Sequence, residues 1–280
     1  MTVHAFSVDV EEAFQVSALA SVINRECWQS QESRVVANTQ RLMALLDDAN
    51  SKGTFFILGW IAEKHPELVR AIESAGHEVA SHGWAHELIF EQDPQVFRQQ
   101  TERSKKLLED LSGKPVLGYR AASFSIRGDS MWALDALAEC GFKYDSSIFP
   151  VRHDVYGIPD AALTPGKLPD HDLIEFPMTT APLLGLKVPV SGGGYFRLFP
   201  YWLTRTLLRR IQSLERSIMF YIHPWEVDPE QPVHAVKGFS KFRHYNNLHQ
   251  CEPRLKRLFQ DFEFTTVEAS LREMGLLSPA

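Results

Sequence analysis

The 280-residue chain contains little cysteine, and its three thiols lie far apart at Cys27, Cys140 and Cys251. None of them forms a CxxC pair and their number is odd, so a disulfide framework is not indicated. We expect three reduced thiols, which fits a protein of a reducing compartment.

The sequence also lacks long apolar runs and an excess of positive charge. No run approaches the roughly 20 apolar residues that span a bilayer. Residues 1–6 show no basic region followed by an apolar stretch, the pattern of a signal peptide. We therefore expect a cytoplasmic protein without an integral membrane segment, although a chain whose leader had been removed would look the same. The formal net charge of −6 argues against a general nucleic-acid binder, which usually carries a basic face.

Short apolar runs alternate with helical patterns along the chain. Strands are expected at residues 3–8, 53–58, 77–81, 116–119, 142–145, 173–176, 218–222 and 262–267, and helices at 39–49, 61–75, 94–111, 130–140, 201–214 and 253–260. This alternation indicates parallel βαβ units. The number of units favours an α/β fold of the closed or nearly closed barrel type, with an open doubly wound sheet as the alternative. No GxGxxG or GxxxxGK motif follows the first strand, which weakens a nucleotide-binding interpretation.

Three segments do not follow the alternation. Residues 12–38 and 150–171 are expected to form loops over the mouth of the barrel. Residues 191–197 contain three glycines, so they are expected to form a flexible loop that either bends the chain or cradles a ligand.

Polar side chains follow the predicted strands where each strand ends. They are Asp9, Glu11, His82, His86, Arg120, Asp145 and His223. The carboxyl ends of the strands of a parallel barrel share one face, where active sites lie. We therefore expect these residues to converge there.

His82 and His86 lie four residues apart. Two imidazoles at this spacing, together with a carboxylate, can bind a divalent metal and leave positions open for water and substrate. The pattern alone is weak, since two of 11 histidines can fall at this spacing by chance. A metal-dependent hydrolase is the most economical interpretation.

The surrounding residues resemble the polysaccharide deacetylase (NodB-homology) family of carbohydrate esterases, from about Val3 to about Val267. Its five motifs are matched by segments 7–11, 76–86, 120–125, 145–149 and 222–226. The resemblance implies a distorted (β/α) barrel and one catalytic domain over residues 1–280, with long mouth loops and a C-terminal extension. It also implies removal of acetyl groups from N-acetylated carbohydrates with a divalent metal, of which zinc is favoured.

The resemblance further implies roles for individual residues. The family's first motif usually ends in two adjacent aspartates, whereas Val10 here separates Asp9 from Glu11. Asp9 is then the general base, and Glu11, His82 and His86 are the metal ligands.

The remaining motifs supply the other polar roles. Arg120 is expected to hold Asp9 by a charge-assisted bond. His223 is expected to be the general acid, oriented by Asp145. Ala122 stands where the family usually has proline.

Five aromatic residues are candidates for stacking on sugar rings, although any of them could instead pack in the core. They are Trp84, Phe124, Phe149, Tyr195 and Trp225.

Segments 7–11, 120–125, 223–226 and 244–248 are similar to deacetylases associated with bacterial exopolysaccharide and exosortase loci. Three other functions remain open. A small-molecule amidohydrolase acting on a cyclic imide or ureide would share the fold and metal site. A non-haem iron oxygenase uses two histidines and a carboxylate as well. A metal-free carbohydrate-binding or scaffold protein could have descended from the enzyme. The identity of the glycan and the oligomeric state are not indicated by the sequence.

Overall fold

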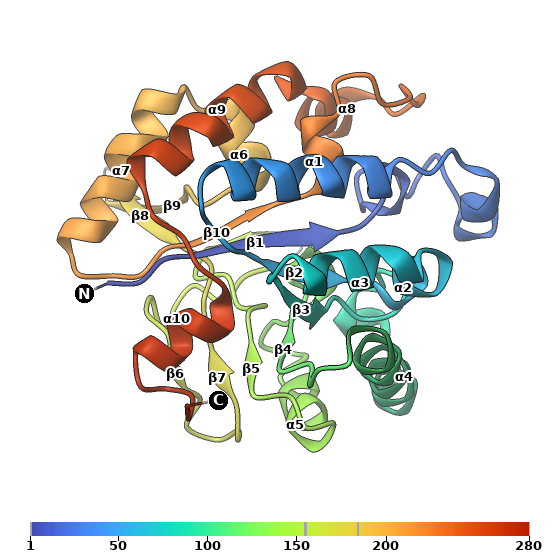
Figure 1. The fold of residues 1–280 in the computed structure, drawn as a ribbon, viewed down its shortest axis with the longest axis horizontal. Coiled ribbons are helices and arrows are strands. Elements are labelled where there is room, and N and C mark those ends of the chain that lie inside the picture. The colour runs from blue at the N-terminus through green and yellow to red at the C-terminus, as the bar shows by residue number, and fades with distance from the viewer. Residues whose placement is uncertain (1, 154–155, 184, 280) are drawn as a thin grey trace.

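The computed structural model describes residues 2–153, 156–183 and 185–279. Its central element is an eight-stranded sheet with the order β10-β1-β2-β3-β4-β5-β7-β6 (Figure 1). All neighbours pair in parallel except β6, which runs antiparallel to β7. The strands are β1 (Ala5–Val10), β2 (Thr54–Ile57), β3 (Glu78–Ser81), β4 (Gly118–Tyr119), β5 (Tyr144–Asp145), β6 (Gly166–Lys167), β7 (Ile174–Glu175) and β10 (Met219–Ile222). A separate antiparallel pair is formed by β8 (Thr180–Leu183) and β9 (Leu186–Pro189).

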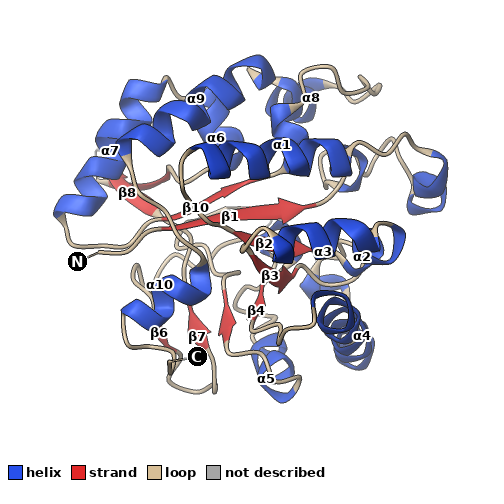
Figure 2. Cartoon of the chain, in the orientation of Figure 1, coloured by secondary structure: helices blue, strands red, loops and turns tan. Residues whose placement is uncertain are grey.

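Helices surround this sheet (Figure 2). They are α1 (Val35–Asp48), α2 (Gly59–Lys64), α3 (Pro66–Ser74), α4 (Pro94–Ser112), α5 (Trp132–Glu139), α6 (Gly193–Leu198), α7 (Tyr201–Ser213), α8 (Gly238–Tyr245), α9 (Leu248–Asp261) and α10 (Val267–Glu273). Within the described ranges, no helix has the length and apolar character that crossing a membrane requires.

The sheet curls, so β1 runs horizontally in Figure 1 whereas β5 and β7 run vertically. Among the described residues β10 and β6 are its two edges, so the ring of strands stays open between them. The result is the distorted (β/α) barrel that was expected from the sequence.

Strand β1 lies at the centre of the molecule, and all six of its residues are buried. Its neighbours are β10, where Val8 aligns with Ile222, and β2, where Val8 aligns with Phe55. Val8 and Val10 on one face of β1 pack in the main hydrophobic core, and burying such side chains is the main source of folding free energy. Ser7 and Asp9 on the other face instead accept hydrogen bonds from Arg120.

The predicted helix over 61–75 is two helices in the structure. Pro66 begins α3 after His65, whose backbone (φ −133°, ψ 62°) is not helical. A proline ring excludes the helical conformation for the residue before it, so the chain bends between α2 and α3.

Two further expectations differ at the C-terminal half. The strand expected at 262–267 is reduced to one bridge between Ala5 and Thr265, because α10 begins directly afterwards. Thr266 caps α10 by accepting a hydrogen bond from the backbone N–H of Ala269. The expected loop at 191–197 instead contains most of α6.

Candidate active site

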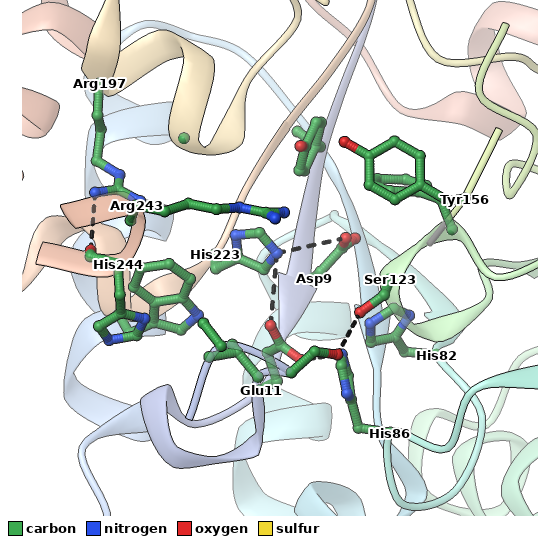
Figure 3. A pocket seen from close by; sticks show the side chains of 17 residues that line it. Asp9, Glu11, His82, His86, Ser123, Tyr156, Arg197, His223, Arg243 and His244 are labelled. Carbon is green, nitrogen blue, oxygen red and sulfur yellow. Dashed lines mark hydrogen bonds and ion pairs between the residues drawn. The ribbon is translucent and has the colours of Figure 1, made fainter. Parts of the chain in front are cut away.

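A cavity of about 120 Å³ opens at the carboxyl ends of the strands. Asp9 and Glu11 reach it from the end of β1, His82 and His86 follow β3, and His223 follows β10. Figure 3 shows these side chains pointing toward one another although they come from distant parts of the sequence. Five of the seven side chains that were expected at the strand ends therefore line this cavity, whereas Arg120 and Asp145 do not.

Asp9 is held by Arg120 in the floor of this cavity. The two side chains form an ion pair of 2.7 Å and are almost completely buried. Arg120 also donates hydrogen bonds to the hydroxyl of Ser7 and to the carbonyl and hydroxyl oxygens of Ser146. These bonds satisfy the guanidinium and fix the carboxylate of Asp9 in one orientation.

Three possible metal ligands lie beside Asp9. Glu11, His82 and His86 are all buried, and one ligand atom of each lies within 4.8 Å of the other two. Glu11 Oε2 is 2.9 Å from His86 Nε2. Two imidazoles and one carboxylate form the ligand set of many catalytic zinc sites.

The surroundings of these residues fit a divalent cation. His82 Nδ1 lies 2.8 Å from the backbone oxygen of Arg120, and a proton on Nδ1 leaves Nε2 free to bind a metal. Glu11 Oε2 is buried and accepts no well-formed hydrogen bond despite its closeness to His86. Burial alone would raise the pKa of Glu11, but the charge of His86, with those of His223 and His82, lowers it to about 2. The site thus offers a buried anionic ligand atom whose close partner, His86, is itself a candidate ligand.

His223 lies beside both Asp9 and Glu11 and is oriented by Glu226. His223 Nδ1 lies 2.7 Å from Glu226 Oε1. Its Nε2 faces the cavity, 3.5 Å from Glu11 Oε1 and 4.0 Å from Asp9 Oδ2. Burial lowers the pKa of His223, but the hydrogen bond and charge of Glu226, helped by Glu11 and Asp9, raise it to about 8. The imidazole therefore keeps a proton near neutral pH.

Glu226 is itself held by a buried cation. Its Oε2 lies 2.5 Å from Arg197 Nε, and both side chains are at most 1% exposed. Burial would raise the pKa of Glu226, whereas Arg197 and His223 lower it to about 2. Arg197 donates its other hydrogen bonds to the backbone oxygens of Arg243, His244 and Asn246.

The expectation that Asp145 orients His223 is wrong. Asp145 accepts hydrogen bonds from the backbone N–H and the hydroxyl of Ser147, and it also bonds to Glu175. Burial raises the pKa of both carboxyl groups. Because the hydroxyl of Ser147 in turn accepts the N–H of Ala121, Asp145 supports the segment that follows Arg120 and does not reach the imidazole.

The five aromatic candidates lie in different places. Phe149 is buried in a core cluster, where its ring packs against that of Phe124. Phe124 and Trp225 line the cavity, and Trp225 stacks on His223 with ring centroids 5.1 Å apart. Tyr195 lines an adjacent cavity instead. Trp84 does not line the cavity. It packs against Gly59, and Arg103 lies 3.5 Å over its ring. The expectation that Trp84 contacts a sugar is therefore wrong.

A strained turn forms one wall of the cavity. Ser123 (φ 52°) and Phe124 (φ 53°) both adopt the left-handed conformation directly after Ala122. Such a conformation costs roughly 1–3 kcal/mol for each residue other than glycine, and it tends to occur at functional sites. A hydrogen bond of 2.9 Å between the hydroxyls of Ser123 and Ser17 ties this turn to the loop after β1.

Sequence reasoning gave no role to several residues that line or support the cavity. They are Ser17, Ser123, Tyr156, Arg197, Tyr221, Glu226 and Arg243. Glu226 lies in the 222–226 motif, three residues after His223, and this spacing could have identified it as a partner of the imidazole. Arg197 stood in the glycine-containing segment that was expected to bend or to cradle a ligand.

The chain resembles known families in two consecutive parts. Residues 29–144 match polysaccharide deacetylase, and residues 146–272 match a domain of unknown function, DUF3473. The peptidoglycan deacetylase-like protein FGM2 of Gibberella zeae is 36% identical over 110 residues, which are 39% of this chain and 32% of that protein. The peptidoglycan deacetylase of Helicobacter pylori is 32% identical over 108 residues, 39% of this chain and 36% of that protein. The match thus spans about a third of the length of these relatives.

Solved structures share the fold over almost the whole chain. A Mycobacterium smegmatis protein assigned as a polysaccharide deacetylase superposes with a TM-score of 0.64 at 20% identity, covering 99% of this chain and 92% of that one. Puue allantoinase superposes with a TM-score of 0.61 at 15% identity, covering 99% and 91%. At these identities the likeness establishes the barrel and not the substrate. Through residues 29–144 the chain belongs to the polysaccharide deacetylase family, with a DUF3473 domain following.

Proposed function

We propose that this protein is a metal-dependent deacetylase that removes N-acetyl groups from amino sugars of a bacterial polysaccharide or its precursor. The observation that carries the proposal is the meeting of three chemical functions around one cavity. Asp9 is a fixed carboxylate, Glu11, His82 and His86 form a ligand set, and His223 is a half-buried imidazole that Glu226 orients and keeps protonated near neutral pH.

Hydrolysis of an acetamide adds water to the acetyl carbon, breaks the C–N bond and protonates the departing amine. A divalent cation bound by Glu11, His82 and His86, which we propose to be zinc, would polarise the carbonyl and make water more acidic. Asp9 is the general base in this proposal, because Arg120 fixes one of its oxygens and leaves Oδ2 on the side of His223.

His223 supplies the second proton transfer. Its Nδ1 is held by Glu226, so Nε2 is the nitrogen that can donate into the cavity. When this proton passes to the sugar nitrogen, acetate and a free amine result. A positioned acid of this kind typically contributes 10²–10⁴-fold, as an order of magnitude, to such a reaction.

Both matched segments contribute to the proposed catalytic unit. His82 and His86 belong to the first and His223 to the second, while Asp9 and Glu11 precede both. β5 of the first part also pairs with β7 of the second in the same sheet. We therefore propose that residues 1–280 act as a single catalytic domain, and the segments quoted above favour an exopolysaccharide substrate.

Acetate release tests the proposal. Purified protein is assayed on N-acetylated oligosaccharides before and after treatment with a chelator, with the metal content measured in parallel. One equivalent of metal and chelator-sensitive acetate release are expected. The cyclic amide alternative is tested by adding allantoin to the panel. Bound metal with allantoin hydrolysis and no acetate release would favour that alternative, and a protein that binds no metal would contradict both.

A further inference from the structure

A second cavity of about 120 Å³ adjoins the first one. Four residues line both cavities, namely Tyr156, Gly194, Tyr221 and Arg243, so the two cavities share a wall. The second cavity is built mainly by α6 and α8, which belong to the segment matched by DUF3473.

The walls of this second cavity are aromatic and partly exposed. Phe239 and Phe242 of α8 are 77% and 50% exposed, and their rings stack with centroids 6.4 Å apart. Tyr195 of α6 lines the same hollow. Leaving two phenylalanine rings this exposed forgoes their burial on folding, which points to a ligand surface. Rigid aromatic faces with nearby polar groups suit the alternating apolar and hydroxyl surfaces of a sugar.

Arg243 stands at the junction of the two cavities. Figure 3 shows its side chain extending into the first pocket, on the side of His223 and Tyr156. Its guanidinium makes no hydrogen bond or ion pair with any residue that the structure describes. It is also the single lysine, arginine, aspartate or glutamate among the described residues that line the second cavity. A cation in such a place can bind a carboxylate or phosphate through two parallel hydrogen bonds.

We propose that the second cavity binds the sugar next to the N-acetylated one, and that Arg243 recognises an anionic group on that glycan. The inference rests on the proposed function, because it extends the proposed substrate from one sugar to an acidic oligosaccharide. Phe239 and Phe242 stack on the neighbouring ring, while Arg243 pairs with its anion. The enzyme then favours acidic glycans over neutral ones.

Binding is the test, because it does not depend on turnover. Calorimetry compares a neutral tetramer of N-acetylglucosamine with a tetramer in which N-acetylglucosamine alternates with glucuronate. We expect the acidic tetramer to bind about tenfold more tightly, since one charge-assisted pair supplies a difference of that order. Arg243→Ala should abolish the difference, and Phe239→Ala and Phe242→Ala should weaken both tetramers by about tenfold.

Matched controls come from the same surface. Lys241→Ala removes a cation of α8 that lines neither cavity, and Trp202→Ala removes an aromatic side chain that is 65% exposed outside them. Both controls should bind the tetramers as the unmodified protein does. N-acetylglucosamine 1-phosphate separates the two sources of anion, because a preference for it over the acidic tetramer would assign Arg243 to a phosphate.

The outcomes distinguish an error in the proposal for the second cavity from an error in the proposed function. If the unmodified protein, the Arg243 variant and the phenylalanine variants all bind both tetramers equally and acetate is still released, the proposal for the second cavity is wrong and the deacetylase proposal stands. If the variants lose binding but the unmodified protein releases no acetate, the second cavity is a sugar site and the deacetylase proposal is wrong. The proteins are also sedimented with anionic phosphatidylglycerol vesicles. If the phenylalanine variants no longer sediment with the vesicles but still bind the tetramers, the aromatic face binds a membrane instead.

Discussion

Replacing Glu226 by glutamine should move the pH dependence of catalysis. Glu226 orients His223, since its Oε1 lies 2.7 Å from His223 Nδ1. The charge and hydrogen bond of Glu226 also raise the pKa of the imidazole to about 8. Glutamine keeps the shape and an acceptor oxygen but removes the negative charge. Burial then dominates, and the pKa of His223 should fall by about one unit or more. A general acid works only while it is protonated, so the alkaline loss of kcat should move to lower pH by the same amount.

The same change should alter stability in a defined pH window. The pKa of His223 in the folded protein lies above its ordinary value of 6.5. Its contribution to stability is therefore complete below pH 6.5 and is lost as the pH rises through about 8. The shift corresponds to about 2 kcal/mol at most. In Glu226→Gln this pH-dependent loss should largely disappear, as denaturant unfolding at several pH values would detect.

The variant should still fold. Removal of one partner from a buried ion pair costs about 3–5 kcal/mol when the other charge is left bare. Arg197, however, keeps three backbone oxygens as acceptors, so we expect a cost near or below the lower end of that range.

Asp145→Asn is the matched control. Asp145 is also a buried carboxyl group at the carboxyl end of a strand, but it bonds to Ser147 and Glu175 and not to His223. The alkaline limb of its kcat profile should stay where it is in the unmodified enzyme. A larger displacement in Asp145→Asn than in Glu226→Gln would refute the assignment of Glu226.

Three further changes test other parts of the structure. Asp9→Asn should lower kcat for acetate release by roughly 10²–10⁴-fold while the metal content stays near that of the unmodified protein, and retained activity would exclude Asp9 as the base. Glu11→Ala should lose metal during dialysis, because two imidazoles remain as ligands; elemental analysis measures this, and full retention would exclude Glu11 as a ligand. Burial raises the pKa of Glu78 from 4.5 to about 7, so stability should fall as the pH rises across that interval. In Glu78→Gln the free energy of unfolding should no longer fall between pH 4.5 and about 7. If it still falls as in the unmodified protein, Glu78 is not the responsible group.

The general fold could be predicted because it depends on patterns that each segment shows by itself. The alternation of strands and helices follows from hydrophobic periodicity, and nearly every expected strand pairs in the sheet. The segment 191–197 could not be read in this way. Gly192 (φ 135°) bridges to Tyr221 so closely that a side chain there would collide with the carbonyl of Tyr221. Gly192 therefore serves a close approach between two backbones, and Gly193 begins α6 against the side chain of Tyr221, so the segment is not a flexible loop.

The candidate site was predictable to the extent that it lies at strand ends. The cluster of Glu11, His82 and His86 follows from the ends of β1 and β3, since parallel strands bring their carboxyl ends together. The partner of His223 depends on the short helical turn that Pro224 begins, which brings residue 226 back to the imidazole. Asp145 and Glu226 were both plausible acids by position, and only the conformation of that turn decides between them.

The spacing of the first acidic pair has its own structural reason. Side chains alternate along a strand, so residues two apart face the same side and adjacent residues face opposite sides. At the end of β1 this places Asp9 and Glu11 together in the cavity, while Val10, which is fully buried, packs in the main hydrophobic core. An aspartate at position 10 would have to leave the strand conformation to reach the same cavity. The acid-x-acid pattern therefore delivers the proposed base and the proposed metal ligand from an undistorted strand, with the longer glutamate at the position just beyond its end.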